Sequence, residues 1–170
     1  MRIETKAASQ LSTIERARTD CVVTSSLYSY QMGTKWANAD WTVMVWEEDE
    51  LVSNVHIIER NALVGGHPVR LGGIGNVATK TEWRGRGYSS SAMKVAQEFL
   101  INSLKVDFGL MTCFAWLVEY YEKMGWKIVA DHLIMEQPDG KKRLNYPVLV
   151  LPVVKKDWPE GEIDLCGLPW

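Results

Sequence analysis

The chain has 170 residues, with 19 Lys and Arg against 21 Asp and Glu, a formal charge of -2 and 46% hydrophobic residues. This length suits one domain, residues 1–170, that buries a core without disulfides or a structural metal. The small net charge gives no overall attraction to nucleic acid, so we expect no nucleic-acid partner and expect any anionic ligand to bind a local site.

The three cysteines, Cys21, Cys113 and Cys166, are odd in number and far apart. This spacing favours neither a disulfide framework nor a metal site, and we expect no metal. The first 20 residues carry charges throughout, and no run approaches the roughly 20 apolar residues of a membrane span. We therefore expect a cytoplasmic protein without a membrane partner.

The first half of the sequence predicts a strand, a helix and three more strands. "RIETKAA" predicts the first strand. Residues near helical spacing predict an amphipathic helix from Leu11 to about Tyr30, namely Ile14, Ala17, Cys21, Val22 and Val23. From Trp41, "WTVMVW", "LVSNVHIIERNALV" and "VRLGGIGNVAT" are joined by the turns "EEDE" and "GGHP", which predicts an antiparallel meander.

The second half predicts alternating helices and strands. One helical face is formed by Ala92, Val95, Ala96, Phe99, Leu100 and Leu104. "FGLMTCF" predicts a strand, and "WLVEYYEKM" predicts a helix that ends at Gly125. "WKIVADHLIMEQ" and "RLNYPVLVLPVV" predict strands around the turn "PDGKK". The predicted order is β, α, β, β, β, α, β, α, β, β.

The loop "EWRGRGYSSS" lies between the meander and the next helix and has the features of a phosphate site. A helix N-terminus offers free amides and partial positive charge, glycines allow close approach, and arginines and serines supply donors. The residues concerned are Arg84, Gly85, Arg86, Gly87, Ser89 and Ser90. The alternative is a surface turn with a serine cap and two solvated arginines. The dinucleotide fingerprint and the P-loop both fit poorly.

"NVATKTEWRGRGYSSSAMK", followed further along by "YYEKMGW", resembles the GCN5-related N-acetyltransferase (GNAT) family. The resemblance implies an α/β (α+β) fold with a mixed central sheet of about seven strands, an antiparallel N-terminal meander and flanking helices. It implies acetyl-CoA as acyl donor. Backbone amides of the loop Arg84, Gly85, Arg86, Gly87, Tyr88 and Ser89 would bind the pyrophosphate, with Ser89 where the family has Gly or Ala. The strand Val77, Ala78 and Thr79 would bind pantetheine.

The resemblance also implies catalytic roles. Tyr121 matches a family tyrosine that acts as general acid toward the CoA sulfur, while Tyr120 beside it is the alternative, as a core residue. The base is unassigned: Glu82 and Glu119 are weak candidates, and Glu59 and His56 also lie near the predicted site. The alternative is that such charges are solvated. Cys113 is expected to be a small core residue rather than a nucleophile.

From about Trp46 onward the chain is similar, more narrowly, to aminoglycoside 2'-N-acetyltransferases, through "LVSNVHIIERNALVGGHPVRLGGIGNVATKTEWRGRG" and "YPVLVLPV". That resemblance implies an antibiotic-resistance enzyme whose acceptor contacts include Asp40, Asp164 and Trp170. The tail also carries Asp157, Glu160 and Glu162. Gly75 stands where the subfamily has a glutamate base, and "GTKWANADW" is shorter than its counterpart. The alternative for the tail is a loosely ordered terminus.

The acceptor remains open at this point. Direct acetyl transfer to an amine of a cationic small molecule is the first reading, and a peptide, a lysine or a polyamine is the second. A non-catalytic acyl-CoA sensor is the reading from a different class. The oligomeric state is open as well, with a homodimer as one option.

Overall fold

Two long strands, β3 (Glu50–Val64) and β4 (His67–Thr79), pass through both compact units of the protein. In this computed structural model, which describes residues 1–26 and 33–170, unit 1 comprises Met1–Thr34, Asn38–Ile58 and Ile74–Glu98. Unit 2 comprises Lys35–Ala37, Glu59–Gly73 and Phe99–Trp170. The expectation of one domain over 1–170 stays a prediction.

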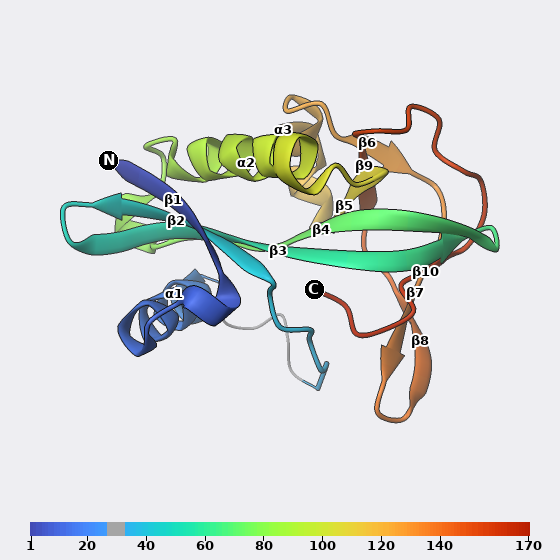
Figure 1. The fold of residues 1–170 in the computed structure, drawn as a ribbon, viewed down its shortest axis with the longest axis horizontal. Helices are drawn as coiled ribbons and strands as arrows, with labels where there is room; N and C mark the ends of the chain where they lie inside the picture. The colour runs from blue at the N-terminus through green and yellow to red at the C-terminus, as the bar shows by residue number, and fades with distance from the viewer. Residues whose placement is uncertain (27–32) are drawn as a thin grey trace. The chain divides into compact units, whose positions relative to one another are not determined.

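In unit 1, the strands lie between two helices, α1 and α2. The elements are β1 (Arg2–Ala7), α1 (Thr13–Ser26), β2 (Trp41–Glu47), parts of β3 and β4, and α2 (Tyr88–Phe99). β1 pairs antiparallel with β2, and β2 pairs antiparallel with β3. Figure 1 shows α1 and α2 on opposite faces of these strands. The predicted meander and first strand are therefore confirmed.

Apolar side chains on the α1 face of the sheet form a core cluster. Its members are Val22, Met44, Trp46, Leu51 and Ala78. Alternation along β2 places every second side chain on this face, and α1 contributes Val22 to it.

The helix itself is confirmed, and so are Val22 and Val23 of its predicted apolar face, through which it packs on the sheet. The other predicted members, Ile14, Ala17 and Cys21, are exposed. The helix begins at Thr13 because Ser12 caps it. The Ser12 Oγ accepts from the amide of Glu15 at 3.2 Å, and the Glu15 carboxylate accepts from the amide of Ser12 at 2.9 Å, which is a capping box. The predicted end near Tyr30 lies outside the described residues.

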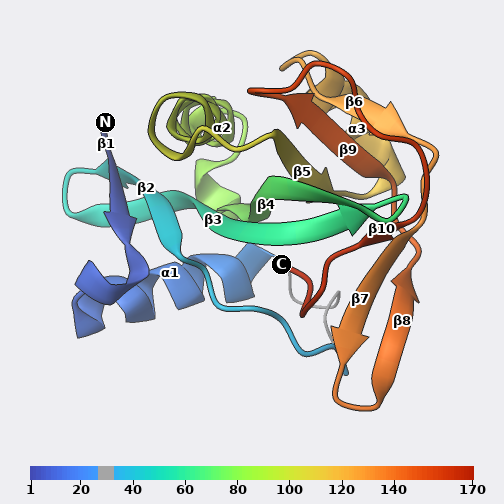
Figure 2. The same cartoon turned by 45° about the vertical axis from the view of Figure 1, so that its right-hand side comes forward.

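In unit 2 a curved, mixed sheet extends β3 and β4 on both sides. Its strand order is β6-β9-β5-β4-β3-β10-β7-β8. β4 pairs parallel with β5, β5 pairs antiparallel with β9, and β10 pairs parallel with β7. The elements are a π-helical turn (Leu100–Leu104), β5 (Phe108–Thr112), α3 (Val118–Glu122), β6 (Lys127–Val129), β7 (Leu133–Gln137), β8 (Gly140–Leu144), β9 (Val148–Pro152) and β10 (Ile163–Asp164). Figure 2 shows β7 and β8 as a hairpin.

The predicted fold class is confirmed, with more strands than expected: the described residues form ten strands of one sheet. The segment "WKIVADHLIMEQ" was expected to be continuous, but it divides into β6 and β7. Asp131 lies at the break, where its carboxylate accepts from the Trp158 indole at 3.0 Å and from the amide of Gly161 at 3.2 Å. These bonds tie the break to the tail.

The C-terminal tail is ordered, which corrects the alternative of a loose terminus. Its strand β10 pairs with both β3 and β7. The Trp170 side chain is only 9% exposed, and a Cβ on Gly73 would lie 2.1 Å from its ring. The close approach of this ring therefore requires glycine at position 73.

Among the described residues, no helix combines the length and the apolar character that crossing a membrane requires.

Candidate active site

Near its C-terminal end, strand β4 contains an irregularity at Asn76, in unit 1. Asn76 has a φ of 46°, in the left-handed region that asparagine tolerates better than most residues. The Asn54 side-chain amide donates to the main-chain oxygen of Asn76 at 3.0 Å. The irregularity is thus held by a fully buried side chain on the neighbouring strand β3.

The three residues predicted to bind pantetheine, Val77, Ala78 and Thr79, follow directly. Ala78 is buried, while Val77 and Thr79 keep partial exposure. The Ser53 hydroxyl contacts the main-chain oxygen of Ala78 and the hydroxyl of Thr79, each at 2.8 Å. Sequence reasoning missed Ser53 and Asn54, whose signal is two adjacent polar residues inside an apolar strand.

The predicted phosphate loop connects the turn Thr81–Trp83 to the start of α2. Gly85 and Gly87 have φ values of 75° and 81°, where a side chain would be strained, and a Cβ on either would meet no atom within 4 Å. The amides of Gly85, Arg86 and Gly87 bond to no acceptor among the described residues. Free amides and open space at a helix N-terminus form a cradle that suits an anion.

Neighbouring main-chain oxygens and the Trp83 ring hold the two arginines of this loop. Arg84 donates from Nε to the main-chain oxygen of Thr79 at 3.2 Å. The Arg86 guanidinium lies 4.8 Å from the centre of the Trp83 ring and donates to the main-chain oxygen of Glu82 at 3.3 Å. These contacts leave further N–H groups on each guanidinium for a ligand.

Tyr88 is the first residue of α2 and anchors the helix start. Its hydroxyl donates to the Glu47 carboxylate at 2.9 Å, and its ring contacts Trp83 edge-on at 5.8 Å. The side chain is therefore a structural support, and the backbone amide is the part of Tyr88 available to a phosphate.

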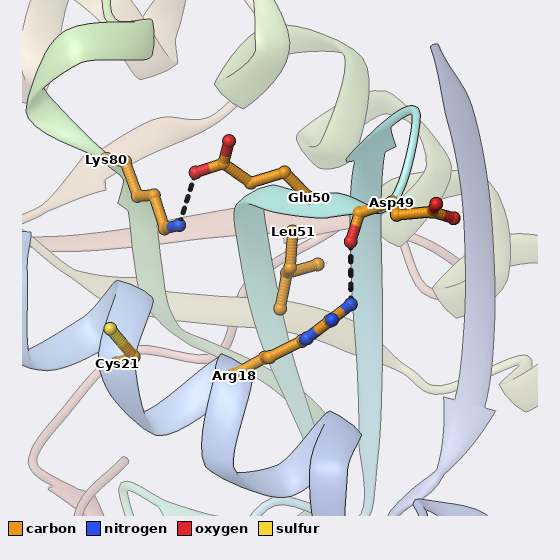
Figure 3. A pocket seen from close by; sticks show the side chains of 6 residues that line it. All are labelled: Arg18, Cys21, Asp49, Glu50, Leu51 and Lys80. Atoms are coloured by element: carbon orange, nitrogen blue, oxygen red, sulfur yellow. Dashed lines mark hydrogen bonds and ion pairs between the residues drawn. The ribbon is translucent and has the colours of Figure 1, made fainter.

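A separate pocket of about 230 Å³ opens beside α1 and the ends of β3 and β4 (Figure 3). Two of its cationic side chains are held within the protein: Lys80 Nζ lies 2.6 Å from the Glu50 carboxylate, and Arg18 donates to the main-chain oxygen of Asp49 at 2.6 Å. Cys21, Leu51 and Asp49 complete the lining.

In unit 2, Tyr121 lies on α3 and is 4% exposed. Burial, with Tyr120 and Cys113 nearby, raises the pKa of its hydroxyl well above the usual range. Tyr121 therefore keeps its proton at neutral pH, as a general acid must. Tyr120 is only partly buried, and its ring contacts that of Tyr121 edge-on at 4.9 Å.

The carboxylates considered as bases lie on exposed or paired positions. Glu82 is exposed, and the side chain of Glu119 is 81% exposed and paired with Lys123 at 2.8 Å. The Lys123 ammonium lowers the pKa of Glu119. Glu59 pairs with Arg70 in unit 2. Their base roles stay predictions without support from burial.

The predicted acceptor contacts are placed as follows. Asp40 is exposed before β2, and the Asp164 carboxylate pairs with Lys141 at 2.5 Å. The Trp170 indole is buried and donates to the main-chain oxygen of Leu110 at 3.4 Å.

Cys113 is buried, and burial raises its pKa to about 11, which favours the inert thiol. Among the described residues, no group of three or more acidic, His or Cys residues is arranged to hold a metal.

A family model described as an acetyltransferase (GNAT) domain matches residues 17–129. The chain belongs to the GNAT acetyltransferase family. No curated protein sequence matches it. As a GNAT acetyltransferase it takes acetyl-CoA as its acyl donor, which confirms the expected cofactor and enzyme class. The narrower aminoglycoside resemblance stays a prediction.

Solved structures of GNAT-like proteins share the fold. Escherichia coli ElaA superimposes with a TM-score of 0.67 at 16% identity, covering 88% of this chain and 98% of that one. An acyl-CoA N-acyltransferase from Pseudomonas aeruginosa gives 0.63 at 16% identity, with the same coverage. A GNAT acetyltransferase from Brucella melitensis, in complex with acetyl-CoA, gives 0.62 at 12% identity and covers 95% of this chain and 94% of that one.

Proposed function

We propose that this GNAT acetyltransferase transfers the acetyl group of acetyl-CoA directly to a primary amine of a cationic small molecule. The most specific candidate for the acceptor is an aminoglycoside with a 2'-amine. One observation carries the donor side: the amides of Gly85, Arg86 and Gly87, before helix α2 and beside open space, bond to no acceptor in the part of the chain that the structure describes.

The geometry of this loop matches the chemistry of a pyrophosphate. The α2 N-terminus adds partial positive charge, and Arg84 and Arg86 are oriented by contacts that use only part of their donor capacity. Both glycines have positive φ, which glycine adopts without strain, so the backbone holds the loop in this conformation. Such preorganisation reduces the ordering cost of binding.

On the acyl side, the edge of β4 at Val77 to Thr79 supports a strand-like contact with pantetheine. Main-chain amides there would also stabilise the oxyanion of the tetrahedral intermediate. Tyr121 would protonate the departing thiolate, and its burial keeps it protonated until then. Cys113 supports no covalent intermediate because its thiol is kept neutral.

The cationic acceptor is supported by the exposed acids of the tail, Asp157, Glu160 and Glu162. Asp164 contributes less charge to a ligand, since Lys141 already pairs with it. An amine of a peptide, a lysine or a polyamine remains the second candidate acceptor.

The donor side is tested by calorimetric titration with CoA. Wild-type protein is expected to bind CoA and to gain about 2.7 kcal/mol of stability at a hundredfold excess over Kd. Gly87→Ala is expected to abolish binding. Gly66→Ala is the matched control, because Gly66 has a φ of 80° and equally open surroundings but lies in the β3–β4 turn. Equal CoA affinity in the two variants would show that the loop does not bind CoA.

The acceptor side is tested by thiol release from acetyl-CoA with tobramycin, spermidine and a lysine peptide. Kanamycin A, which carries a 2'-hydroxyl in place of the 2'-amine, is the control for tobramycin. Turnover with tobramycin alone supports the aminoglycoside acceptor, and turnover with the peptide alone supports the second candidate. CoA binding with no thiol release from any amine would indicate a sensor.

A further inference from the structure

A group of polar side chains interrupts the apolar α1 face of the sheet in unit 1. In the β2–β3 register, Asn54 lies opposite Met44, and His56 lies opposite Thr42. Directly opposed residues share a face, so Asn54 and His56 lie on the same side as the core residue Met44. Polar groups in such a layer are costly unless they are bonded, which indicates a specific role.

These side chains converge on the irregular residue of β4. The His56 ring nitrogen Nδ1 lies 3.1 Å from the side-chain amide of Asn76, and Asn54 donates to the Asn76 main-chain oxygen at 3.0 Å. Asn76 immediately precedes the strand proposed to hold the thioester. The imidazole is therefore fixed to the residue next to the proposed reaction centre.

One member of the group, Asn54, has a side-chain atom without a hydrogen-bond partner among the described residues. The Asn54 Oδ1 is buried and accepts no hydrogen bond among the described residues. Leaving a buried acceptor unpaired costs about 1–3 kcal/mol, so this atom has the capacity to accept one further hydrogen bond, from a water or from a ligand. His56 as a residue keeps partial exposure.

We propose that His56 is the base that takes the proton from the acceptor nitrogen, and that Asn76 positions its ring. This inference rests on the proposed function and assigns the base that no carboxylate on β4 supplies, since Gly75 occupies that part of the strand. Compared with Glu82 and Glu119, His56 is the candidate that is both partly enclosed and bonded to the acyl-binding strand.

The contact with Asn76 fixes the tautomer of the ring. In the structure the Asn76 Nδ2 faces the His56 Nδ1 at 3.1 Å, and the base role requires the flipped orientation of this amide, in which Oδ1 accepts from the His56 Nδ1–H. The Nε2 lone pair is then free to accept a proton. The same amide oxygen stabilises the imidazolium once both ring nitrogens carry hydrogen.

The electrostatics keep the ring unprotonated before the reaction. Burial among its neighbours lowers the pKa of His56 to about 4, and Asp20 on α1 acts in the opposite direction. Asn76 and Thr42 face the ring without charge. The imidazole is therefore neutral at pH 7, and it does not repel a cationic acceptor.

The protons balance over the complete reaction. The amine enters neutral after losing one proton to solvent, and its nitrogen attacks the thioester carbon. The nitrogen becomes positive and strongly acidic as the C–N bond forms, so His56 Nε2 takes its second proton. The C–S bond breaks, the thiolate takes a proton from Tyr121, and both side chains exchange with solvent to regain their starting states.

The test compares His56→Gln, Asn76→Gly and Asn76→Asp, with tobramycin and spermidine as acceptors. His56→Gln is expected to lower kcat by about 100-fold or more while CoA affinity stays unchanged. Asn76→Gly keeps the positive φ and removes the ring contact, so a smaller loss of kcat is expected. Asn76→Asp places a carboxylate beside the ring, so the acid limb of kcat/KM should move to higher pH.

A purely structural role for these residues would not move the acid limb. Wild-type kcat in His56→Gln, or an unmoved limb in Asn76→Asp, would overturn the assignment while leaving the proposed function intact. Failure of wild-type protein to bind CoA or to release thiol with any amine would overturn the proposed function and this inference together.

Discussion

The side-chain amide of Asn54 on β3 donates to the main-chain oxygen of Asn76 on β4 at 3.0 Å, and Asn54 is fully buried. This bond holds the left-handed residue of β4 next to the strand proposed to bind the acyl group. A side chain on one strand thereby sets the backbone shape of its neighbour.

We expect Asn54→Ala to lower the free energy of unfolding by about 2 kcal/mol, because the Asn76 oxygen loses its donor. Turnover should fall as well, since β4 can relax beside the acyl site. Asn61→Ala, an exposed asparagine on the same strand, is the control and should change neither quantity. Urea unfolding and thiol release measure the two effects, and normal turnover in Asn54→Ala would contradict the expected link.

Removing the Tyr121 hydroxyl tests the general acid. We expect Tyr121→Phe to reduce kcat by about 100-fold or more, because the thiolate would depart without a proton. CoA affinity should stay the same. Tyr120→Phe is the matched control, since Tyr120 is the adjacent tyrosine on the same helix and only partly buried. Equal losses in the two variants would reject the assignment of Tyr121.

Some elements of the fold can be predicted from the sequence and others cannot. The β-branched and aromatic residues of "WTVMVW" predict β2, and the glycines of "RGRG" predict a loop with positive φ, because both depend on local backbone preferences. Of the predicted apolar face of α1, Val22 and Val23 pack on the sheet, but Ile14 is 67% exposed, because tertiary packing decides which part of the helix is covered.

The residues of the candidate site also differ in how well the sequence predicts them. The loop residues Arg84 to Gly87 are consecutive, so their motif is visible in the sequence. The His56, Asn76 and Asn54 group is assembled by the pairing of separate strands, and no local pattern reports that pairing. The division of "WKIVADHLIMEQ" at Asp131 likewise depends on a distant residue, Trp158.

The pH dependence of stability tests the environment of His56. Its folded pKa of about 4 lies below the ordinary value of 6.5, so the unfolded chain binds the proton more tightly. The stabilising contribution is present above pH 6.5 and is lost as the pH falls toward 4, by at most about 3 kcal/mol. Urea unfolding at pH 7 and at pH 4.5 should show a smaller loss for His56→Gln than for wild type.

The control for this measurement is His67→Gln, at an exposed position in the β3–β4 turn region. It should reproduce the wild-type loss between the two pH values. Identical pH dependence in wild type and His56→Gln would mean that the imidazole is not held in its neutral form by the fold.

The last prediction concerns the contact between Gly73 and Trp170. A Cβ at position 73 would lie 2.1 Å from the indole ring. Gly73→Ala must displace a ring that is 9% exposed and bonded to Leu110, so we expect a loss of about 2 kcal/mol or more in unfolding free energy. A smaller ring should relieve the overlap. The double variant Gly73→Ala with Trp170→Phe is therefore expected to lose less than the sum of the two single variants, as non-additivity between contacting residues requires. Strict additivity, measured by urea unfolding, would show that the ring does not pack against Gly73.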